Sequence, residues 1–205
     1  EILKFETTPK RDYVLMDPTH AYPGKELKKW RRSIVLDKPV TTLIVDEVEA
    51  ALGSTIEARF FPAVAPTNAR PAREARAPLA SGVDYIVYGD YVLLKSQRHA
   101  MALIPLVLDN SFKILEDKVS VEPVMEDARL NWIPYLETVT KAKTQSSVIV
   151  TILTPVLDQK DAESVVKTAK IAKIGSGQVE ITVVREGKEF KWLFEKEKDG
   201  FVLRN

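Results

Sequence analysis

A chain of 205 residues with 45% hydrophobic and 29% charged residues has the composition of an ordinary globular protein, which excludes disorder along the whole chain. Its net charge of +1 excludes the strongly basic surface that nucleic-acid binding requires, so we expect no nucleic-acid partner. The chain has no cysteine and no window close to the ~18–20 uninterrupted apolar residues of a membrane span, so no disulfide, Cys-ligated zinc site or transmembrane segment is predicted.

The first segments predict two short strands and a loop. The chain opens without Met in Ile2 to Phe5, a stretch typical of a strand, and we therefore expect a cut, processed or trimmed chain. A second strand is predicted over Asp12 to Met16, which contains Tyr13 and Val14. Asp17 to Lys29 holds two prolines and a glycine, which predicts a surface loop.

The stretch from Trp30 to Val48 predicts the clearest pair of strands. Pro39 has no amide proton for a ladder, so Lys38-Pro39 is predicted to form the turn. Apolar and polar residues alternate on both arms, and one face of the pair is therefore expected to lie in the core. The residues expected there are Ile34, Leu36, Leu43 and Val45.

Two registers of this strand pair are open. In the preferred one, Ile34 lies opposite Leu43 and Arg31 opposite Asp46. A slip of one residue would instead bring Arg32 opposite Asp46 and turn the side chains of one strand to the other face.

A long loop is the main candidate for a functional surface. After a predicted turn at Glu49 to Gly53 and a strand at Ser54 to Phe61, the segment 62–82 is rich in proline and alanine, and we expect protease to cut there first. Loops of this length are uncommon unless they have a function or are mobile. The simplest interpretation is a solvated excursion, and the alternative is a basic finger that contacts a partner or an anionic ligand. Its contact residues would be Arg70, Arg73 and Arg76.

The second half of the chain predicts further strands and little helix. The segment from 126 to 143 is interpreted as irregular followed by a strand, and Asp158 to Glu163 as a polar connection. Residues from about 165 to 205 predict a C-terminal hairpin unit around Glu186-Gly187. Together the segments predict one all-β domain over 1–205, an antiparallel β-sandwich with many short strands. The other strands are predicted at Val83 to Tyr88, Tyr91 to Lys95, Met101 to Leu108, Ser111 to Leu115, Lys118 to Val124 and Ser147 to Leu153.

No motif points to catalysis. His20 and His99 have no paired spacing for a metal, and a lone Asp17-x-x-His20 pattern is weak evidence for a general base. Phosphate loops, nucleophile elbows and zinc-helix motifs do not occur in the sequence. We therefore predict no catalytic residue, metal site or cofactor, while tyrosines near Tyr88 offer an aromatic surface that could stack on sugar rings.

Three motifs in order carry a family resemblance. They are DPTHAYP over 17–23, WRRSIVL over 30–36 and TLIVDEV over 42–48. This order resembles the C-terminal β-sandwich region of heparinase II/III-like polysaccharide lyases, over roughly residues 2–155. The matching positions are Asp17, Tyr22, Arg32 and Asp46, as scaffold residues.

The resemblance implies a part of an enzyme that cleaves uronic-acid-containing polysaccharides by β-elimination. In that family the catalytic groups lie mainly on an upstream helical toroid and on an early histidine, and neither His20 nor His99 matches that histidine. The resemblance thus implies a chain that is inactive alone, an acidic polysaccharide and a toroid domain as partners, and an extracellular or periplasmic location. The alternatives are a stand-alone carbohydrate-binding or protein-interaction module and a self-sufficient enzyme.

Overall fold

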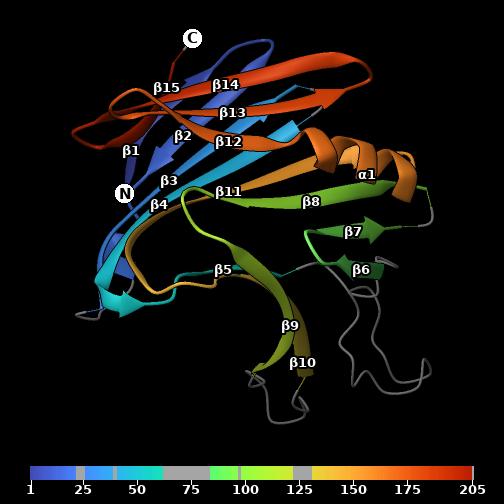
Figure 1. Ribbon diagram of the computed structural model, residues 1–205, viewed down its shortest axis with the longest axis horizontal. Coiled ribbons are helices and arrows are strands. Elements are labelled where there is room, and N and C mark those ends of the chain that lie inside the picture. Colours follow the sequence, from blue (N-terminus) through green and yellow to red (C-terminus); the bar gives the residue numbers. More distant parts are fainter. Residues whose placement is uncertain (22–25, 39–40, 62–83, 97, 122–130, 205) are drawn as a thin grey trace.

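The computed structural model describes residues 1–21, 26–38, 41–61, 84–96, 98–121 and 131–204, and these form an almost entirely β structure (Figure 1). No helix among them is long and apolar enough to cross a membrane. The first strands are β1 (Ile2–Thr7), β2 (Arg11–Met16), β3 (Leu27–Asp37), β4 (Thr41–Ser54) and β5 (Glu57–Phe60), with the short 3-10 helix η1 (Thr19–Ala21) before β3. They are followed by β6 (Asp84–Tyr88), β7 (Tyr91–Lys95), β8 (Ala100–Val107), β9 (Phe112–Val121), β10 (Asn131–Thr140) and β11 (Thr144–Val156). The chain ends with helix α1 (Gln159–Thr168) and strands β12 (Lys170–Ile174), β13 (Gln178–Arg185), β14 (Lys188–Glu197) and β15 (Gly200–Arg204).

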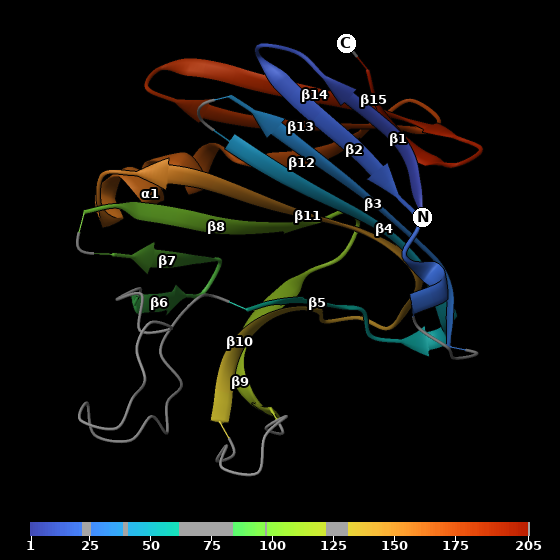
Figure 2. The same ribbon diagram turned by 180° about the vertical axis from the view of Figure 1, so that it is seen from behind.

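The described strands form three antiparallel sheets, the largest of which is central. The central sheet has eight strands in the order β1-β2-β3-β4-β11-β8-β7-β6. A four-stranded sheet, β12-β13-β14-β15, stacks on one of its faces, and a three-stranded sheet, β5-β10-β9, extends from the opposite face (Figures 1 and 2). The predicted all-β antiparallel sandwich is confirmed.

Strand β11 lies at the centre and is buried on both faces. Val150 and Ile152 belong to the core shared with the four-stranded sheet, whereas Ile149 packs with Ile56 and Val107 on the opposite side. A strand covered on both faces needs apolar side chains in both directions. This explains why β11 contains the nearly continuous apolar run VIVTIL rather than strict alternation.

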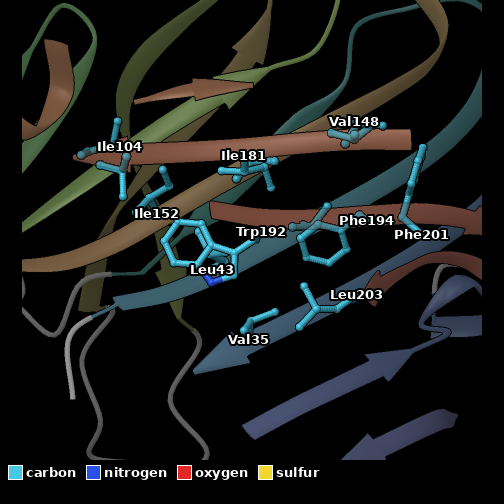
Figure 3. Packing of buried hydrophobic residues seen from close by; sticks show 14 of the residues in the cluster. Val35, Leu43, Ile104, Val148, Ile152, Ile181, Trp192, Phe194, Phe201 and Leu203 are labelled. Carbon is cyan, nitrogen blue, oxygen red and sulfur yellow. The ribbon is translucent and has the colours of Figure 1, made fainter. Parts of the chain in front are cut away.

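The main core lies between the eight-stranded and four-stranded sheets (Figure 3). Trp192 and Phe194 of β14 are fully buried and face Val35 and Leu43 of β3 and β4. Polar contacts also join the two sheets: Trp192 Nε1 donates to Asp37 Oδ2 at 3.0 Å, and Ser33 Oγ donates to the carbonyl oxygen of Phe201 at 3.0 Å.

The register of β3 and β4 differs from the preferred one. Arg32 pairs with Asp46, and Val35 pairs with Leu43. Since Asp37 pairs with Thr41, three residues rather than two connect the strands, and this extra residue produces the slip. Val35 therefore lies in the core with 0% exposure, whereas Leu36 is 39% exposed, so the prediction that Ile34 and Leu36 are core residues is wrong. Leu43 and Val45 are buried as predicted.

Helix α1 replaces the polar connection predicted at Asp158 to Glu163 and the first residues of the C-terminal hairpin unit predicted from about residue 165. Asp158 caps it by accepting a hydrogen bond from the backbone NH of Asp161 at 2.9 Å, and Ala162 and Val165 are buried against the core. With only two fully buried positions at helical spacing, the ten-residue segment gives little periodic signal. Strands β12 to β15 follow the helix, within the C-terminal unit predicted over about 165–205.

Two other segments were predicted as interrupted and are continuous. Strand β4 runs through the predicted turn at Glu49 to Gly53 and ends near Gly53, whose φ is +80°. Strand β9 is a single strand where two were predicted. Pro134 is tolerated inside β10 because, among the residues that the structure describes, β5 pairs with Leu136 to Val139 and the proline has a neighbouring strand, β9, on one side alone.

The register can be tested with two leucines of the same strand pair. Leu43→Ala removes a fully buried side chain and should lower the free energy of unfolding by ~2–5 kcal/mol. Leu36→Ala, at a 39% exposed position, should lower it by less than about 1 kcal/mol. Urea unfolding followed by tryptophan fluorescence measures both. Equal losses would contradict the observed register.

Candidate functional site

The arginines predicted from sequence to contact a ligand or partner are not among the residues that the structure describes. Arg70, Arg73 and Arg76, together with the loop that carries them, lie outside the described residues, as does Tyr22. His20 lies exposed in η1, and His99 lies exposed beside the turn before β8. Within the described part of the chain no three His, Cys, Asp or Glu residues are grouped as a metal site.

Trp30, Arg32 and Asp46 form a tight cluster on β3 and β4. Arg32 holds the carboxylate of Asp46 with two hydrogen bonds, Nε to Oδ1 at 2.7 Å and an NH2 group to Oδ2 at 3.0 Å. Trp30 Nε1 donates to Asp46 Oδ1 at 2.6 Å, and the Arg32 guanidinium lies 4.7 Å from the centre of the Trp30 ring. With three charge-assisted bonds the buried Asp46 is engaged in holding the strands together, which supports its predicted scaffold role.

Asp17, the first scaffold position of the family pattern, is held by a second cluster. Thr19 donates its backbone NH to Asp17 Oδ1 at 3.0 Å, and Arg31 approaches the same oxygen at 2.5 Å. Burial opposes ionisation of Asp17, but the hydrogen bonds from Thr19 and the charge of Arg31 outweigh it and lower the pKa of this carboxyl. Arg31 Nε also donates to the carbonyl oxygen of Asp199, so η1 and the β14–β15 turn are linked through one guanidinium.

One face of β1–β4 is only partly covered. On the face opposite the four-stranded sheet, Phe5 pairs across with Val14, Val14 with Ile34, and Ile34 with Ile44. Of these four residues, Phe5 is 66% exposed and the other three are half-buried. Leu36 lies on the same face, two residues after Ile34 along β3. The described part of the three-stranded sheet packs instead over β11, β8 and β7. We call the surface formed by Phe5, Val14, Ile34, Leu36 and Ile44 the free face.

A cleft of about 640 Å³ opens at one end of the main core. It lies between β4 and β11 on one side and β12, β14 and β15 on the other, and we call it the end cleft. Val148 and Phe201 contribute apolar surface, and Figure 3 shows both at the same end of the core. A second cleft of about 590 Å³ lies beside β1 and β2 and includes Arg11 and Asp37, which are paired with each other.

Glu47 is the polar group at the end cleft that was missed from the sequence. Its side chain is buried, and its Oε1 accepts from Lys29 Nζ at 3.1 Å and lies 3.3 Å from Lys196 Nζ. Its Oε2 is buried and has no hydrogen-bond partner within the described residues. Gly200 packs against it so closely that an added Cβ would lie 3.1 Å from Oε2.

A signal for Glu47 was present in the alternation of β4. Leu43, Val45 and Glu47 occupy every second position and share one face, so the alternation places Glu47 on the inward side after two core residues. The same holds on β14, where Lys196 follows Trp192 and Phe194. An ionisable residue in line with two core residues is a stronger indication of a site than a histidine in a loop.

The Asp17 cluster predicts a pH-dependent loss of stability. Asp17→Asn removes the charge that pairs with Arg31 and should lower the free energy of unfolding by about 1 kcal/mol at neutral pH. Because the folded-state pKa is lowered, this contribution is complete above the unfolded pKa and disappears as pH falls through the folded pKa. Urea unfolding at several pH values should therefore show the two proteins converging in acid.

The control is Asp109→Asn, which removes an exposed partner of Lys173 and should change stability by less than about 0.5 kcal/mol at any pH. A constant difference between wild type and Asp17→Asn from neutral to acid pH would contradict the role of the Asp17 charge.

Comparisons with known proteins yield structural matches alone. No protein-family model and no curated protein matches the sequence. The fold is similar to that of heparinase III, with a TM-score of 0.65 and 16% identity over 95% of this chain and 27% of that one. It is also similar to the heparan sulfate lyase HepC from Pedobacter heparinus, with a TM-score of 0.61 and 14% identity over 100% of this chain and 27% of that one.

This chain therefore spans about a quarter of the length of the lyases it matches. At such low identity the likeness concerns the fold, and at that level the resemblance predicted from the ordered motifs is confirmed. The chain is an antiparallel β-sandwich of the kind that forms part of heparinase III and HepC.

Proposed function

We propose that this chain is the non-catalytic C-terminal β-sandwich of a heparinase II/III-like polysaccharide lyase, where it supports the substrate cleft of an enzyme that acts by β-elimination on uronic-acid-containing polysaccharides. The observation that carries the proposal is the coverage: the match takes in 95–100% of this chain but 27% of each lyase. A domain that makes up about a quarter of an enzyme would work together with the other three quarters of that polypeptide. The proposal includes the acidic polysaccharide as substrate of the whole enzyme and an extracellular or periplasmic location.

The free face supports a partner domain in the same polypeptide. A sheet face that carries Phe5, Leu36 and three further apolar side chains is unusual for a surface that stays in water. Domains are built of layers that bury such faces against one another. We propose that the upstream helical toroid covers it, because the matched lyases contain about three times as much chain outside the matched part as within it.

The state of the charged groups also supports a scaffold role. Elimination needs a base that is placed to take a proton and a group that neutralises the uronate carboxylate. Asp46 and Arg32 are bound to each other, and Arg31 is bound to Asp17, so these groups hold the sandwich together. The alternative function, a stand-alone carbohydrate-binding module, is favoured by the end cleft, whose size falls in the usual range for ligand pockets of roughly 300–1,000 Å³.

Activity assays separate the two functions. The 205-residue chain alone should produce no unsaturated uronate absorbance from heparan-type or alginate-type polymers, whereas the longer natural polypeptide that contains it should produce it from one of them. Turnover by the chain alone that is lost on substitution of His20 or His99 would overturn the scaffold role. Inactivity of the longer polypeptide on both polymers would favour the stand-alone module.

The covering of the free face can be tested on the longer polypeptide. The double change Phe5→Ser and Leu36→Ser should lower its Tm by several degrees and reduce its turnover, because both side chains would lose a partner surface. In the 205-residue chain alone the same change should have little effect on Tm. Leu157→Ser, at an 89% exposed position off the free face, is the matched control and should be neutral in both proteins. Equal effects in the two proteins would rule out a domain over this face.

A further inference from the structure

We propose that this chain forms a weak symmetric dimer in which the β1 strands of two copies pair edge to edge and join the two eight-stranded sheets into one. Strand β1 forms one edge of that sheet, and no other described strand pairs with its outer side (Figure 2). An edge strand presents backbone NH and C=O groups to any strand that can align with it. The inference concerns a second copy of this chain and goes beyond the proposed lyase function.

The first observation is the direction of the backbone groups along β1. Thr8 donates its backbone NH to the carbonyl oxygen of Arg11 at 2.7 Å, across the turn that joins β1 to β2. Backbone groups alternate in direction along an antiparallel strand, so those of Glu6 also point toward β2, whereas those of Phe5 point outward. Within the described residues no strand lies there to bond the NH and C=O groups of Phe5.

The second observation is the charge pattern on either side of Phe5. Lys4 and Glu6 lie on the same face of β1 and form an ion pair at 2.8 Å. When two copies of β1 run antiparallel with the two Phe5 residues opposite each other, each Lys4 faces a Glu6 of the second copy. A pair centred on Lys4 or on Glu6 would instead oppose like charges and use backbone groups that already point to β2. Of these registers, the one centred on Phe5 alone suits both the backbone and the charges.

The third observation is the exposed aromatic ring at the centre of this register. Phe5 is 66% exposed on the free face. In the proposed pair the two Phe5 rings become direct cross-strand neighbours, and such aromatic pairs stabilise strand pairing. The two-fold axis of the pair is perpendicular to the sheet, so the two free faces lie on the same side. Pairing through β1 therefore extends the free face rather than burying it.

A bulge limits the length of the new ladder. The register between β1 and β2 shifts between Ile2 and Lys4, so β1 is regular only from Lys4 to Thr7. A ladder this short buries less than the ~1,200 Å² of a stable interface, and we expect dimers at roughly 100 μM and monomers at roughly 5 μM. Thermal unfolding at low concentration therefore reports on the monomer.

Charge reversal on β1 tests the inference by sedimentation velocity over this range of concentration. Lys4→Glu would oppose two glutamates at both ends of the ladder, and Glu6→Lys would oppose two lysines. Each variant alone should weaken the dimer about tenfold. An equimolar mixture of the two variants should restore it, because in the mixed pair opposite charges again face each other at both ends. Lys191→Glu reverses a lysine that is paired with Glu180 on the four-stranded sheet, and this control should dimerise like the wild type.

Hydrogen exchange followed by NMR locates the interface. The backbone amide of Phe5 should exchange more slowly at the high concentration than at the low one, because it becomes bonded in the dimer. An unchanged Tm at roughly 5 μM shows that each variant is folded.

Three results would overturn the inference: a wild-type chain that stays monomeric at roughly 500 μM, single variants that dimerise as tightly as the wild type, or a mixture that associates no better than each variant alone. A dimer that packs the free faces together would survive both charge reversals, because Lys4 lies over the Tyr13 ring on the opposite face. Such a dimer would be lost in Leu36→Ser, and that result would also contradict pairing through β1. The elimination assay on the longer polypeptide is independent of all these outcomes.

Discussion

The register between β3 and β4 determines which side chains face each layer of the molecule. Because Asp37 pairs with Thr41, Val35 and Leu43 face the four-stranded sheet, and Arg32 meets Asp46 on the opposite face. A shift of one residue would turn the side chains of one strand to the other face, so that Val35 or Leu43 would leave the core and the bidentate ion pair would be separated. The same alternation carries Glu47 to the end of the main core and Ile34 and Ile44 to the free face, so the composition of both surfaces depends on it.

Three of the polar contacts between the two stacked sheets lie around this strand pair. Trp192 reaches Asp37, Ser33 reaches the backbone of Phe201, and Arg31 reaches the backbone of Asp199. Apolar burial supplies most of the stabilisation in such a core but has little directional preference, whereas hydrogen bonds fix position. These three bonds therefore help to fix how β14 and β15 lie over β3.

The sequence allowed the fold class and the central strand pair to be predicted because alternation over 30–48 and 179–194 is strong. It failed where a single extra residue changes the outcome: alternation alone does not distinguish a two-residue from a three-residue connection, and the preferred register was wrong. Helix α1 was missed because ten residues with two buried positions give a weak period. Glu47 was not predicted as a site residue because it belongs to no known motif, although its place in line with Leu43 and Val45 marked it as inward-facing.

The position of β11 has a consequence for how the chain reaches its structure. Val150 pairs with Val45 and with Leu106, so the strand that completes the central sheet is synthesised about a hundred residues after one of its neighbours. Contacts of such large sequence separation form slowly, because the loop between them must be closed before any of them is gained. Until β11 arrives, the buried edges of β4 and β8 are unpaired and prone to pairing with other chains. The rate of folding, more than the stability of the folded state, would then limit how much folded protein is obtained. Pairing of β11 between β4 and β8 would be the slow step in forming the eight-stranded sheet.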